Sequence, residues 1–310
     1  MRAVEYSKTG GPEVLTVVEV EEPEPGPGQA LVSVEAAGIN PYDYKVVSGT
    51  IDTGKPFPRR VGGDLAGTIV SVGKGAAYWD GTPMQVGDRV MGSGSGALAE
   101  QVIVTGKAVT LVPEGLDIET AGALNVPGLT ATSLMATVPV GPADTLLVGG
   151  ATGAVGMIAC QIAAQAGARV IGTAGARNHG FLQEIGVEPV LYGPGLVERI
   201  EDQLKGGTER VTTVWDCHGR EALDAGITLD VPRDRMVAIA AYSALKELGV
   251  LNVEFAARTP KNLAVLAKQV ADGSIILPIV ATYPLNQVAD AFTALAATHA
   301  PGKIVVKEMQ

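Results

Sequence analysis

The sequence predicts an α/β protein of two domains, in which a β-rich domain accompanies one with a doubly wound parallel sheet. The chain of 310 residues has the length of about two ordinary domains. Apolar residues make up 46% of it and charged residues 18%, which is enough apolar material for buried cores. Short strand-like segments fill the first part of the sequence, and from about residue 118 strand-like and helix-like segments alternate.

The composition excludes several classes of protein. Glycine accounts for 40 of the 310 residues, about 13%, against a usual value of about 7%. No Gly-X-Y period accompanies this excess, so the glycines serve backbone geometry in a folded protein rather than a collagen-like helix or a linker. The net charge of -10 disfavours a nucleic-acid partner, because phosphate backbones are bound by clustered Lys and Arg.

The cysteines and the apolar runs predict a cytoplasmic protein with no membrane partner. Only Cys160 and Cys217 are present, too few for a disulfide scaffold, and no signal-peptide pattern follows Met1. The longest apolar runs are far shorter than the roughly 18 residues that span a bilayer.

The first 117 residues are expected to form the β-rich domain. Alternating segments at residues 30–35 and 67–72, for example, are bounded by glycine and proline, as half-buried strands are. An acidic, proline-rich stretch at residues 21–28 is expected to be a surface loop.

Residues 118–268 are expected to form the doubly wound sheet, because strands there alternate with helices. The expected strands are residues 144–148, 168–172, 189–192, 211–216 and 235–239. The expected helices are residues 156–167, which are rich in alanine and end at glycine, and residues 181–185. Residues 269–310 add a helix at 286–297 and a strand at 303–307.

The sharpest motif joins the first strand of this sheet to its first helix. Its sequence is LLVGGATGAVG, at residues 146–156. Gly150 and Gly153 allow a tight turn and a close approach of the backbone to a pyrophosphate, and Gly156 lets the helix pack on the strand. The free N–H groups and positive dipole end of the helix start also favour phosphate. We therefore expect dinucleotide binding through Gly150, Ala151, Thr152, Gly153, Ala154, Val155 and Gly156. The alternative is a strand-to-helix turn without a ligand.

The end of the next expected strand favours NADPH over NADH. A carboxylate about 20 residues beyond the glycines would bind the ribose 2′-hydroxyl of NAD. Residues 172–179 (GTAGARNH) contain no acidic side chain, whereas Thr173 and Arg177 can bind a 2′-phosphate. The alternative for Arg177 is a solvated side chain at the start of a helix, where the helix dipole disfavours a cation.

Five stretches of sequence occur in the order found in one known superfamily. They are AAGINPYDYK at 36–45, VGGDLAG at 61–67 followed by VGDRV at 86–90, VPGLTA at 126–131, the glycine loop, and PGKIVV at 301–306. The chain thereby resembles the medium-chain dehydrogenase/reductase superfamily, in its zinc-independent quinone oxidoreductase branch. The resemblance implies a GroES-like β-barrel catalytic domain of residues 1–117 and 269–310, with a Rossmann NADPH-binding domain of residues 118–268 between them. It also implies an active site in the cleft between the domains and a homodimer.

The same resemblance argues against a metal. Zinc-dependent relatives bind their catalytic metal through a Cys, a His and a second Cys, and these positions match Asn40, Gly63 and Val126. None of the three supplies a thiolate or an imidazole, and Asp64 matches the Glu beside the His. Residues 91–96, where a structural zinc lobe would begin, contain no cysteine. We therefore expect no metal site.

Without a metal, hydrogen-bond donors must stabilise the oxyanion or enolate that develops on the substrate. The resemblance places Asn40 near the nicotinamide, and Tyr42 and Lys45 can supply further donors. These three are the candidate catalytic residues. The alternatives are an Asn-Pro turn for Asn40, a partner within the fold for the Tyr42 hydroxyl and a solvated side chain for Lys45.

The resemblance also implies cofactor contacts outside the glycine loop. They are Thr130, Tyr192, Ala240, Tyr242 and Lys303. Thr130 is expected to approach the nicotinamide, which Ala240 and Tyr242 flank. Tyr192 is expected beside the 2′-phosphate or the adenine, and its alternative is packing at the sheet edge.

Together these features predict an NADPH-dependent, zinc-independent reductase that transfers hydride to a quinone or an α,β-unsaturated carbonyl. An enoyl-thioester reductase shares the hydride step, but its substrate's phosphates would need a basic surface, which the acidic composition disfavours. A third alternative is a non-catalytic NADPH-binding protein, against which the polar residues Asn40, Tyr42 and Lys45 argue.

Overall fold

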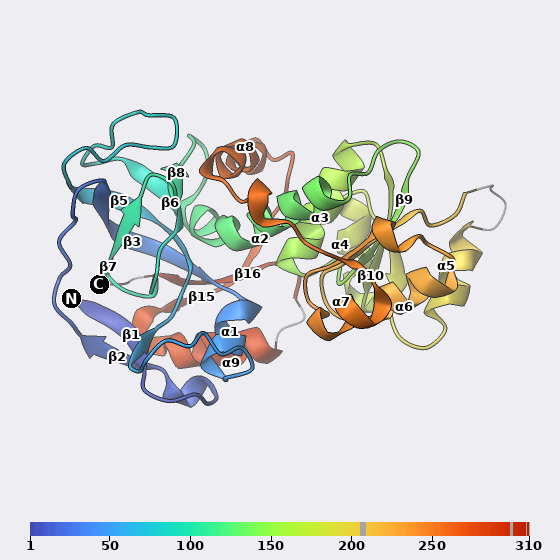
Figure 1. The fold of residues 1–310 in the computed structure, drawn as a ribbon, viewed down its shortest axis with the longest axis horizontal. Helices are drawn as coiled ribbons and strands as arrows, with labels where there is room; N and C mark the ends of the chain where they lie inside the picture. Colours follow the sequence, from blue (N-terminus) through green and yellow to red (C-terminus); the bar gives the residue numbers. More distant parts are fainter. Residues whose placement is uncertain (205–208, 298–299, 308, 310) are drawn as a thin grey trace. The chain divides into compact units, whose positions relative to one another are not determined.

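Figure 1 shows the computed structural model, in which the described residues are 1–204, 209–297, 300–307 and 309. The chain divides into two compact units. Unit 1 comprises Met1–Val126, Thr259–His299 and Lys303–Gln310. Unit 2 comprises Pro127–Arg258 and Ala300–Gly302.

The strands described in unit 1 form two sheets. The smaller has the order β2-β1-β4, and the larger has the order β15-β16-β3-β5-β6-β8, with β7 also paired to β3. The strands are β1 (Arg2–Tyr6), β2 (Thr16–Glu19), β3 (Gln29–Ile39), β4 (Arg59–Arg60), β5 (Asp64–Val72), β6 (Arg89–Ser93), β7 (Gln101–Thr105), β8 (Val109–Leu111), β15 (Ile279–Pro284) and β16 (Lys303–Lys307). β16 runs antiparallel to β3 with Ile304 opposite Ile39, so segments far apart in the sequence share one sheet.

The helices of unit 1 pack apolar faces on these sheets. They include α1 (Pro41–Val47), α8 (Pro260–Ala271), α9 (Val288–Ala297) and the first part of α2 (Ile118–Thr137). In α9 the buried residues Val288, Ala291 and Phe292 have the spacing of one helix face. They join the core of unit 1, which also contains Tyr6 and Leu65.

The first part of α2 lies against β3, backbone on backbone. A Cβ placed on Gly38 would lie 2.7 Å from Ala123 Cα, and one on Gly122 would lie 2.6 Å from the Ala36 carbonyl oxygen. Only glycine permits this approach. This packing explains why unit 1 extends to Val126, beyond the change in composition near residue 118. The division into functional domains after residues 117 and 268 stays a prediction.

The described strands of unit 2 form a six-stranded sheet in the order β11-β10-β9-β12-β13-β14. They are β9 (Thr145–Gly149), β10 (Arg169–Ala174), β11 (Glu188–Leu191), β12 (Thr213–Asp216), β13 (Met236–Ala238) and β14 (Leu251–Asn252). Every pair is parallel. The order reverses beside β9, which is the Rossmann arrangement, and ligands bind such sheets beyond the carboxyl ends of the strands at that reversal.

Helices cover both faces of this sheet. They are α3 (Ala154–Gln165), α4 (His179–Glu184), α5 (Leu196–Leu204), α6 (Glu221–Thr228), α7 (Tyr242–Leu248) and the remainder of α2. Leu147 and Val214 face a core that α5, α6 and α7 complete. The alternate residues Leu146, Val148 and Trp215 are also fully buried, so neither face meets water.

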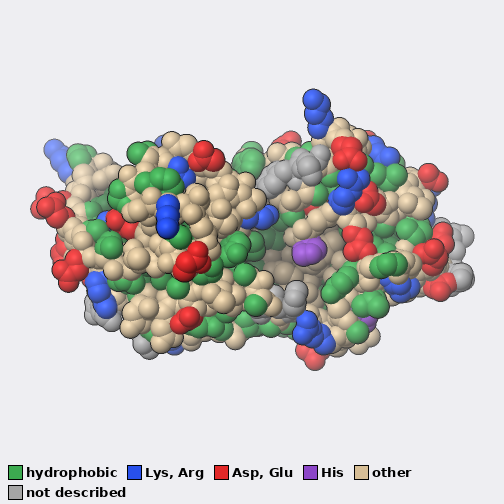
Figure 2. Space-filling view, turned by 90° about the horizontal axis from the view of Figure 1, so that it is seen from below, with side chains coloured by type: hydrophobic (Ala, Val, Ile, Leu, Met, Phe, Trp, Pro, Cys, Tyr) green, Lys and Arg blue, Asp and Glu red, His purple; other side chains and the backbone are tan. Residues whose placement is uncertain are grey.

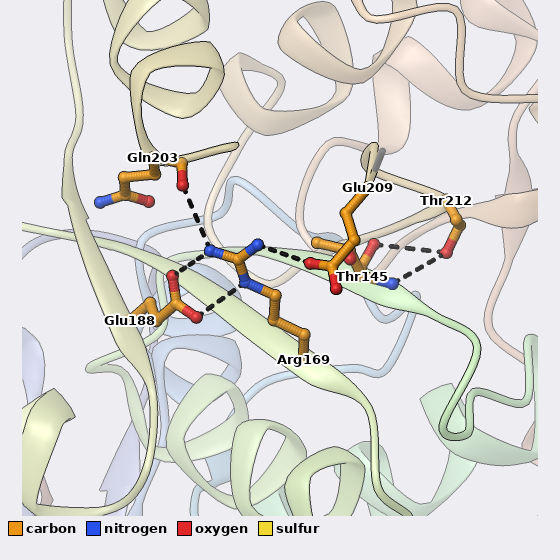
Figure 3. Close-up of polar contacts among 6 residues, drawn as sticks. All are labelled: Thr145, Arg169, Glu188, Gln203, Glu209 and Thr212. Carbon is orange, nitrogen blue, oxygen red and sulfur yellow. Dashed lines mark hydrogen bonds and ion pairs between the residues drawn. The ribbon is translucent and has the colours of Figure 1, made fainter. Parts of the chain in front are cut away.

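A cluster of ion pairs and hydrogen bonds links residues at the amino ends of strands in the unit 2 sheet (Figure 3). Arg169, at the start of β10, donates to both carboxylate oxygens of Glu188 at 2.8 and 2.7 Å and to Glu209 at 2.7 Å. Thr145, at the start of β9, donates its N–H to the Thr212 hydroxyl at 3.2 Å. These contacts stabilise the amino-terminal end of the sheet. The glycine loop lies at the opposite end, where the strands have their carboxyl ends.

Candidate functional site

The loop between β9 and α3 is the close-packed turn that its glycines predict. Gly150 follows β9 with a φ of 70°, a left-handed conformation that favours glycine. A Cβ on Gly150 would lie 2.6 Å from the Cβ of His218, and one on Gly156 would lie 2.2 Å from the Gly150 carbonyl oxygen. Ala151 is fully buried beneath the turn. Side chains at the two glycine positions would therefore push the turn apart.

The start of α3 is open and uncapped. The helix begins at Ala154 with Gly153 as its N-cap, and this N-cap makes no side-chain hydrogen bond to the helix start. Such N–H groups have no partner within a helix and carry the positive end of its dipole. A Cβ on Gly153 would meet only the Gly150 oxygen, at 3.4 Å. Thr152 and Val155 are half-buried beside it. Gly153 itself is exposed, so the start of α3 has the open, uncapped character that phosphate-binding helix starts share.

Thr173 of β10 lies inside the same turn. Its hydroxyl oxygen accepts a hydrogen bond from the Gly150 N–H at 2.9 Å, and its carbonyl oxygen accepts one from the Ala151 N–H at 3.1 Å. The side chain is buried. Thr173 therefore braces the glycine loop, a role that we did not expect from the sequence, and its contact with a 2′-phosphate stays a prediction.

Arg177 and Tyr192 lie beyond the carboxyl ends of the neighbouring strands β10 and β11. Arg177 is exposed in a short 3-10 turn, Ala176–Asn178, and Tyr192 is 53% exposed. The Tyr192 hydroxyl lies 3.7 Å from the place that a Cβ of Gly175 would take. The phenol thus lies against the turn that leads to Arg177, where a cation and a hydroxyl are both accessible.

Asp216 ends β12 and organises the turns beside it. Its Oδ1 accepts from the His218 N–H at 2.9 Å, and its Oδ2 accepts from the Ala241 N–H at 3.2 Å. Burial raises the pKa of Asp216, and these backbone donors oppose that rise. The carboxylate thereby fixes the turn after β13, which contains Ala240. Tyr242 begins α7, and its side chain lies outside the described part of the structure.

Thr130 lies buried in α2 and is held by an arginine. Its hydroxyl accepts a hydrogen bond from Nη2 of Arg258 at 3.0 Å. The Arg258 guanidinium also lies over the Phe255 ring, 4.5 Å from its centroid. Both contacts restrict the guanidinium, so the orientation of the Thr130 hydroxyl is restricted as well.

In unit 1, Asn40 lies between β3 and α1. The Asn40 N–H donates to Oδ2 of Asp43 at 2.8 Å, and Pro41 takes the first helical position. The Asn-Pro pair thus forms the N-cap and the first residue of α1, and the catalytic role of Asn40 stays a prediction. Tyr42 and Lys45 are three residues apart on α1 and share one face of it. Tyr42 is exposed and Lys45 is half-buried.

The Asn40 side chain belongs to a group of buried polar residues. Its Nδ2 donates to Oδ2 of Asp64 at 3.0 Å, and its Oδ1 accepts from Nζ of Lys303 at 2.6 Å. Nζ also donates to the Ile39 carbonyl at 2.8 Å and lies 3.6 Å from Asp64. We expected Lys303 to contact the cofactor, which stays a prediction; its ammonium contacts oxygens of unit 1. The group, called the buried cluster below, is Asn40, Asp43, Asp64, Asn125 and Lys303.

The charges of the buried cluster perturb one another. Burial raises the pKa of Asp43 to about 6, and the negative charge of Asp64 adds to the rise. Burial lowers the pKa of Lys303, while both carboxylates oppose that change. One ammonium therefore faces two carboxyl groups, of which Asp43 takes up a proton below about pH 6.

The described residues contain neither a clustered set of metal ligands nor a membrane-spanning helix. No group of three or more His, Cys, Asp and Glu side chains there is arranged to hold a metal ion. In the same part of the chain, no helix has both the length and the apolar character needed to cross a membrane.

Comparisons with known proteins agree with this geometry. The family models described as alcohol dehydrogenase GroES-like domain and zinc-binding dehydrogenase match residues 26–114 and 194–306. Escherichia coli quinone oxidoreductase and a mycobacterial protein, both solved in complex with NADPH, each have a TM-score of 0.86 at 26% and 30% identity. Each comparison covers 99% of this chain and 100% of the other. The quinone oxidoreductase of Pongo abelii is 30% identical over an alignment of 333 residues, covering 99% of this chain and 97% of the relative. This chain belongs to the quinone oxidoreductase family.

Membership of the quinone oxidoreductase family confirms the predicted superfamily and the predicted fold, a GroES-like part with a Rossmann-like parallel sheet. Two polar residues that contact candidate site residues, Asn125 and Arg258, were not identified from the sequence. Asn125 donates to Asp64 at 3.1 Å, and its place just before the VPGLTA stretch was the available signal. Arg258 had no local signal, because its partner Thr130 is 128 residues away.

Proposed function

We propose that this protein is an oxidoreductase that uses NADPH to reduce a quinone. The glycine loop between β9 and α3 carries the proposal, because its uncapped helix start and its open side at Gly153 fit a pyrophosphate. Relatives named quinone oxidoreductase and relatives solved with NADPH support it. Arg177, with no acidic residue in the same turn, favours NADPH over NADH.

In this proposal unit 2 holds the cofactor. The glycine loop binds the pyrophosphate through backbone N–H groups, and Thr173 keeps the loop in shape. Arg177 and Tyr192 bind the 2′-phosphate end. The further proposed contacts are Thr130, Ala240 and Tyr242. When bound, NADPH supplies the hydride that reduction of a quinone requires.

Unit 1 supplies the hydrogen bonds at the substrate. A quinone that accepts one hydride and one proton becomes a hydroquinone, so its oxygen must be stabilised and protonated. Tyr42 and Lys45 present an O–H and an N–H donor on one face of α1. Asn40, whose amide is held in the buried cluster, fixes the start of that helix. We propose these three residues as the catalytic group.

We also propose that the reaction needs no zinc. Asn40, Gly63 and Val126 stand where zinc-dependent relatives have their ligands, and none of these side chains is a thiolate or an imidazole. The hydrogen-bond donors on α1 then stabilise the negative charge that develops on the substrate oxygen, as a metal ion would in a zinc-dependent enzyme.

An α,β-unsaturated carbonyl is the second candidate substrate. Lys45 favours it, because an ammonium can polarise the oxygen of an enone while hydride adds to its β-carbon. An enoyl thioester with phosphate groups is less favoured, since the net charge is -10. On the face shown in Figure 2, Lys and Arg side chains are scattered among Asp and Glu rather than gathered in a patch.

One set of assays tests the proposal. Oxidation of NADPH is followed by absorbance with an ortho-quinone, a 2-alkenal and crotonyl-CoA, and each is repeated with NADH. We expect turnover with the quinone and NADPH. Tight NADPH binding without turnover of any substrate would refute the proposal that the protein is an enzyme. Equal rates with NADH and NADPH would refute the proposed contact of Arg177 with the 2′-phosphate. The homodimer, tested by light scattering, and the cytoplasmic location stay predictions.

A further inference from the structure

The buried cluster contains an ammonium whose contacts all lie within unit 1. Lys303 is 4% exposed, and its Nζ lies 2.6 Å from Asn40 Oδ1 and 3.6 Å from Asp64 Oδ2. Lysine is almost never fully buried unless it is paired. Lys307, on the same strand, shows the ordinary arrangement: its side chain is 36% exposed and pairs with Glu119 at 2.6 Å. Burial of the Lys303 ammonium, unlike the partial exposure of Lys307, is therefore a feature that we expect to serve a specific role.

The contacts of Lys303 and Asp64 give the Asn40 amide one orientation. An ammonium only donates hydrogen bonds, and it lies on Oδ1 of Asn40. An ionised carboxylate only accepts them, and it lies on Nδ2 of Asn40. A flipped amide would turn its NH₂ group toward the ammonium and its oxygen toward the carboxylate. Both contacts would then be repulsive, so the flipped amide is excluded.

The groups on either side of Asn40 are themselves fixed. Oδ1 of Asp64 accepts from Nδ2 of Asn125 at 3.1 Å and from the Val126 N–H at 2.9 Å. Lys303 opens β16, whose next residue, Ile304, pairs with Ile39 of β3. The ammonium and the carboxylate therefore approach Asn40 from elements that cannot shift independently.

We propose that Lys303 is a positioning residue for quinone reduction: its ammonium fixes the Asn40 amide and, through it, the start of α1 that presents Tyr42 and Lys45. The inference rests on the proposed function. The backbone N–H of Asn40 donates to Oδ2 of Asp43, and Pro41 follows as the first helical residue, so the residue whose side-chain amide Lys303 contacts is the residue at which α1 begins. Lys303 acts at a distance from the substrate, and its loss would misplace donors rather than remove one.

A double-mutant cycle tests the proposal. Lys303→Met keeps an unbranched side chain, shorter by one atom, and removes the charge. We expect kcat with an ortho-quinone to fall about 10- to 100-fold, as when a reacting group is misplaced. In an Asn40→Ala background the same change should cost little more, because no amide is left to position. Losses that multiply in the double variant would overturn the proposal.

The affinity for NADPH separates the two roles considered for Lys303. A positioning residue should leave the Kd for NADPH, measured by fluorescence titration, within about twofold of wild type. A Kd that rises in step with the loss of kcat would make Lys303 a cofactor contact and overturn the proposal. Lys307→Met is the matched control, since it removes an ammonium of β16 outside the buried cluster, and its kcat should equal that of wild type.

A second variant covers the risk that Lys303→Met does not fold. Lys303→Met leaves Asp64 buried without its cation, which destabilises a protein. Lys303→Met combined with Asp64→Asn removes both charges and keeps an oxygen that can accept from Asn125 and Val126. This double variant should fold and show a fall in kcat at least as large, because an amide at position 64 would also turn an N–H group toward Nδ2 of Asn40. Wild-type kcat in the folded double variant would overturn the proposal.

The orientation of Asn40 can also be read without turnover. In nitrogen-15 spectra, the Asn40 side-chain amide, identified by its loss in Asn40→Ala, should exchange slowly with water because it is buried and hydrogen-bonded. Lys303→Met, or the charge-neutral double variant, should speed that exchange, and unchanged exchange would overturn the proposal. Faster exchange in a protein that reduces no quinone would refute the proposed function alone, since Lys303 would still orient Asn40.

Discussion

Two residues of the glycine loop, Gly156 and Gly153, allow an effect on stability to be separated from an effect on NADPH binding. In Gly156→Ala the new methyl group would lie 2.2 Å from the Gly150 carbonyl oxygen, about an ångström or more inside ordinary contact. The obstacle is backbone, so it moves only if β9 and α3 separate. Overpacking of this kind costs about 1–3 kcal/mol. Each kcal/mol lowers Tm by about 2–4 °C in a protein of moderate size.

Gly153→Ala is the matched control for that strain. Its methyl group would meet only the Gly150 oxygen, at 3.4 Å, and Gly153 has a φ of -69°, which alanine adopts freely. The free energy of unfolding should therefore stay within about 1 kcal/mol of wild type. The methyl group would nevertheless take up space where we place the pyrophosphate. We expect the Kd for NADPH to rise at least about tenfold, which is about 1.4 kcal/mol.

Urea unfolding followed by circular dichroism gives the stability of each variant, and NADPH fluorescence gives its Kd. The expected pattern is a destabilised Gly156→Ala and a stable Gly153→Ala that binds NADPH weakly. If Gly153→Ala binds NADPH as wild type does, the loop does not hold the pyrophosphate. If the two variants are equally stable, the steric argument for Gly156 is wrong.

The dependence on pH, cofactor and metal gives three more tests. Asp43 has a pKa of about 6 in the folded protein. An unfolded chain would give it a pKa near 3.9, so the free energy of unfolding falls as pH rises from about 4 to above 6. Asp43→Asn should remove that fall, at most about 3 kcal/mol, in urea unfolding across this window; an unchanged fall would assign it to another group. Arg177→Ala should raise the KM for NADPH about tenfold and leave that for NADH unchanged, and equal rises would contradict the 2′-phosphate contact. Dialysis against EDTA should leave the rate of quinone reduction unchanged, whereas a loss restored by zinc would contradict the metal-free mechanism.

Features that depend on neighbours along the chain could be predicted from the sequence. Within residues 146–156 the apolar run specifies a strand, the glycines specify a turn, and the alanines that follow specify a helix. The observed β9 and α3 have those places, to within a few residues. The strand predicted at residues 303–307 is likewise β16. Local periodicity decides these elements, because their burial follows the same period.

Features that depend on distant partners could not be predicted. α2 runs through Pro127, a residue that ordinarily ends or kinks a helix, so the local sequence at this point argues against the helix that is observed. Lys303 and Asn40 are 263 residues apart, and no local pattern shows an ammonium on an amide at that distance. For Thr173 the residue type suggested a phosphate contact, whereas the fold turns its hydroxyl toward Gly150, 23 residues earlier.

The place of β16 in the larger sheet of unit 1 sets an order of assembly during synthesis. The described strands of the unit 2 sheet lie within residues 145–252, so they can pair before residues 303–307 leave the ribosome. Until then the β3 segment that pairs with β16, residues 36–39, has an unpaired edge on that side, and such edges invite association between chains. Arrival of β16 covers the edge and delivers the Lys303 ammonium to Asn40 in the same event. A nascent chain can therefore complete its glycine loop while the groups proposed for chemistry are still unassembled.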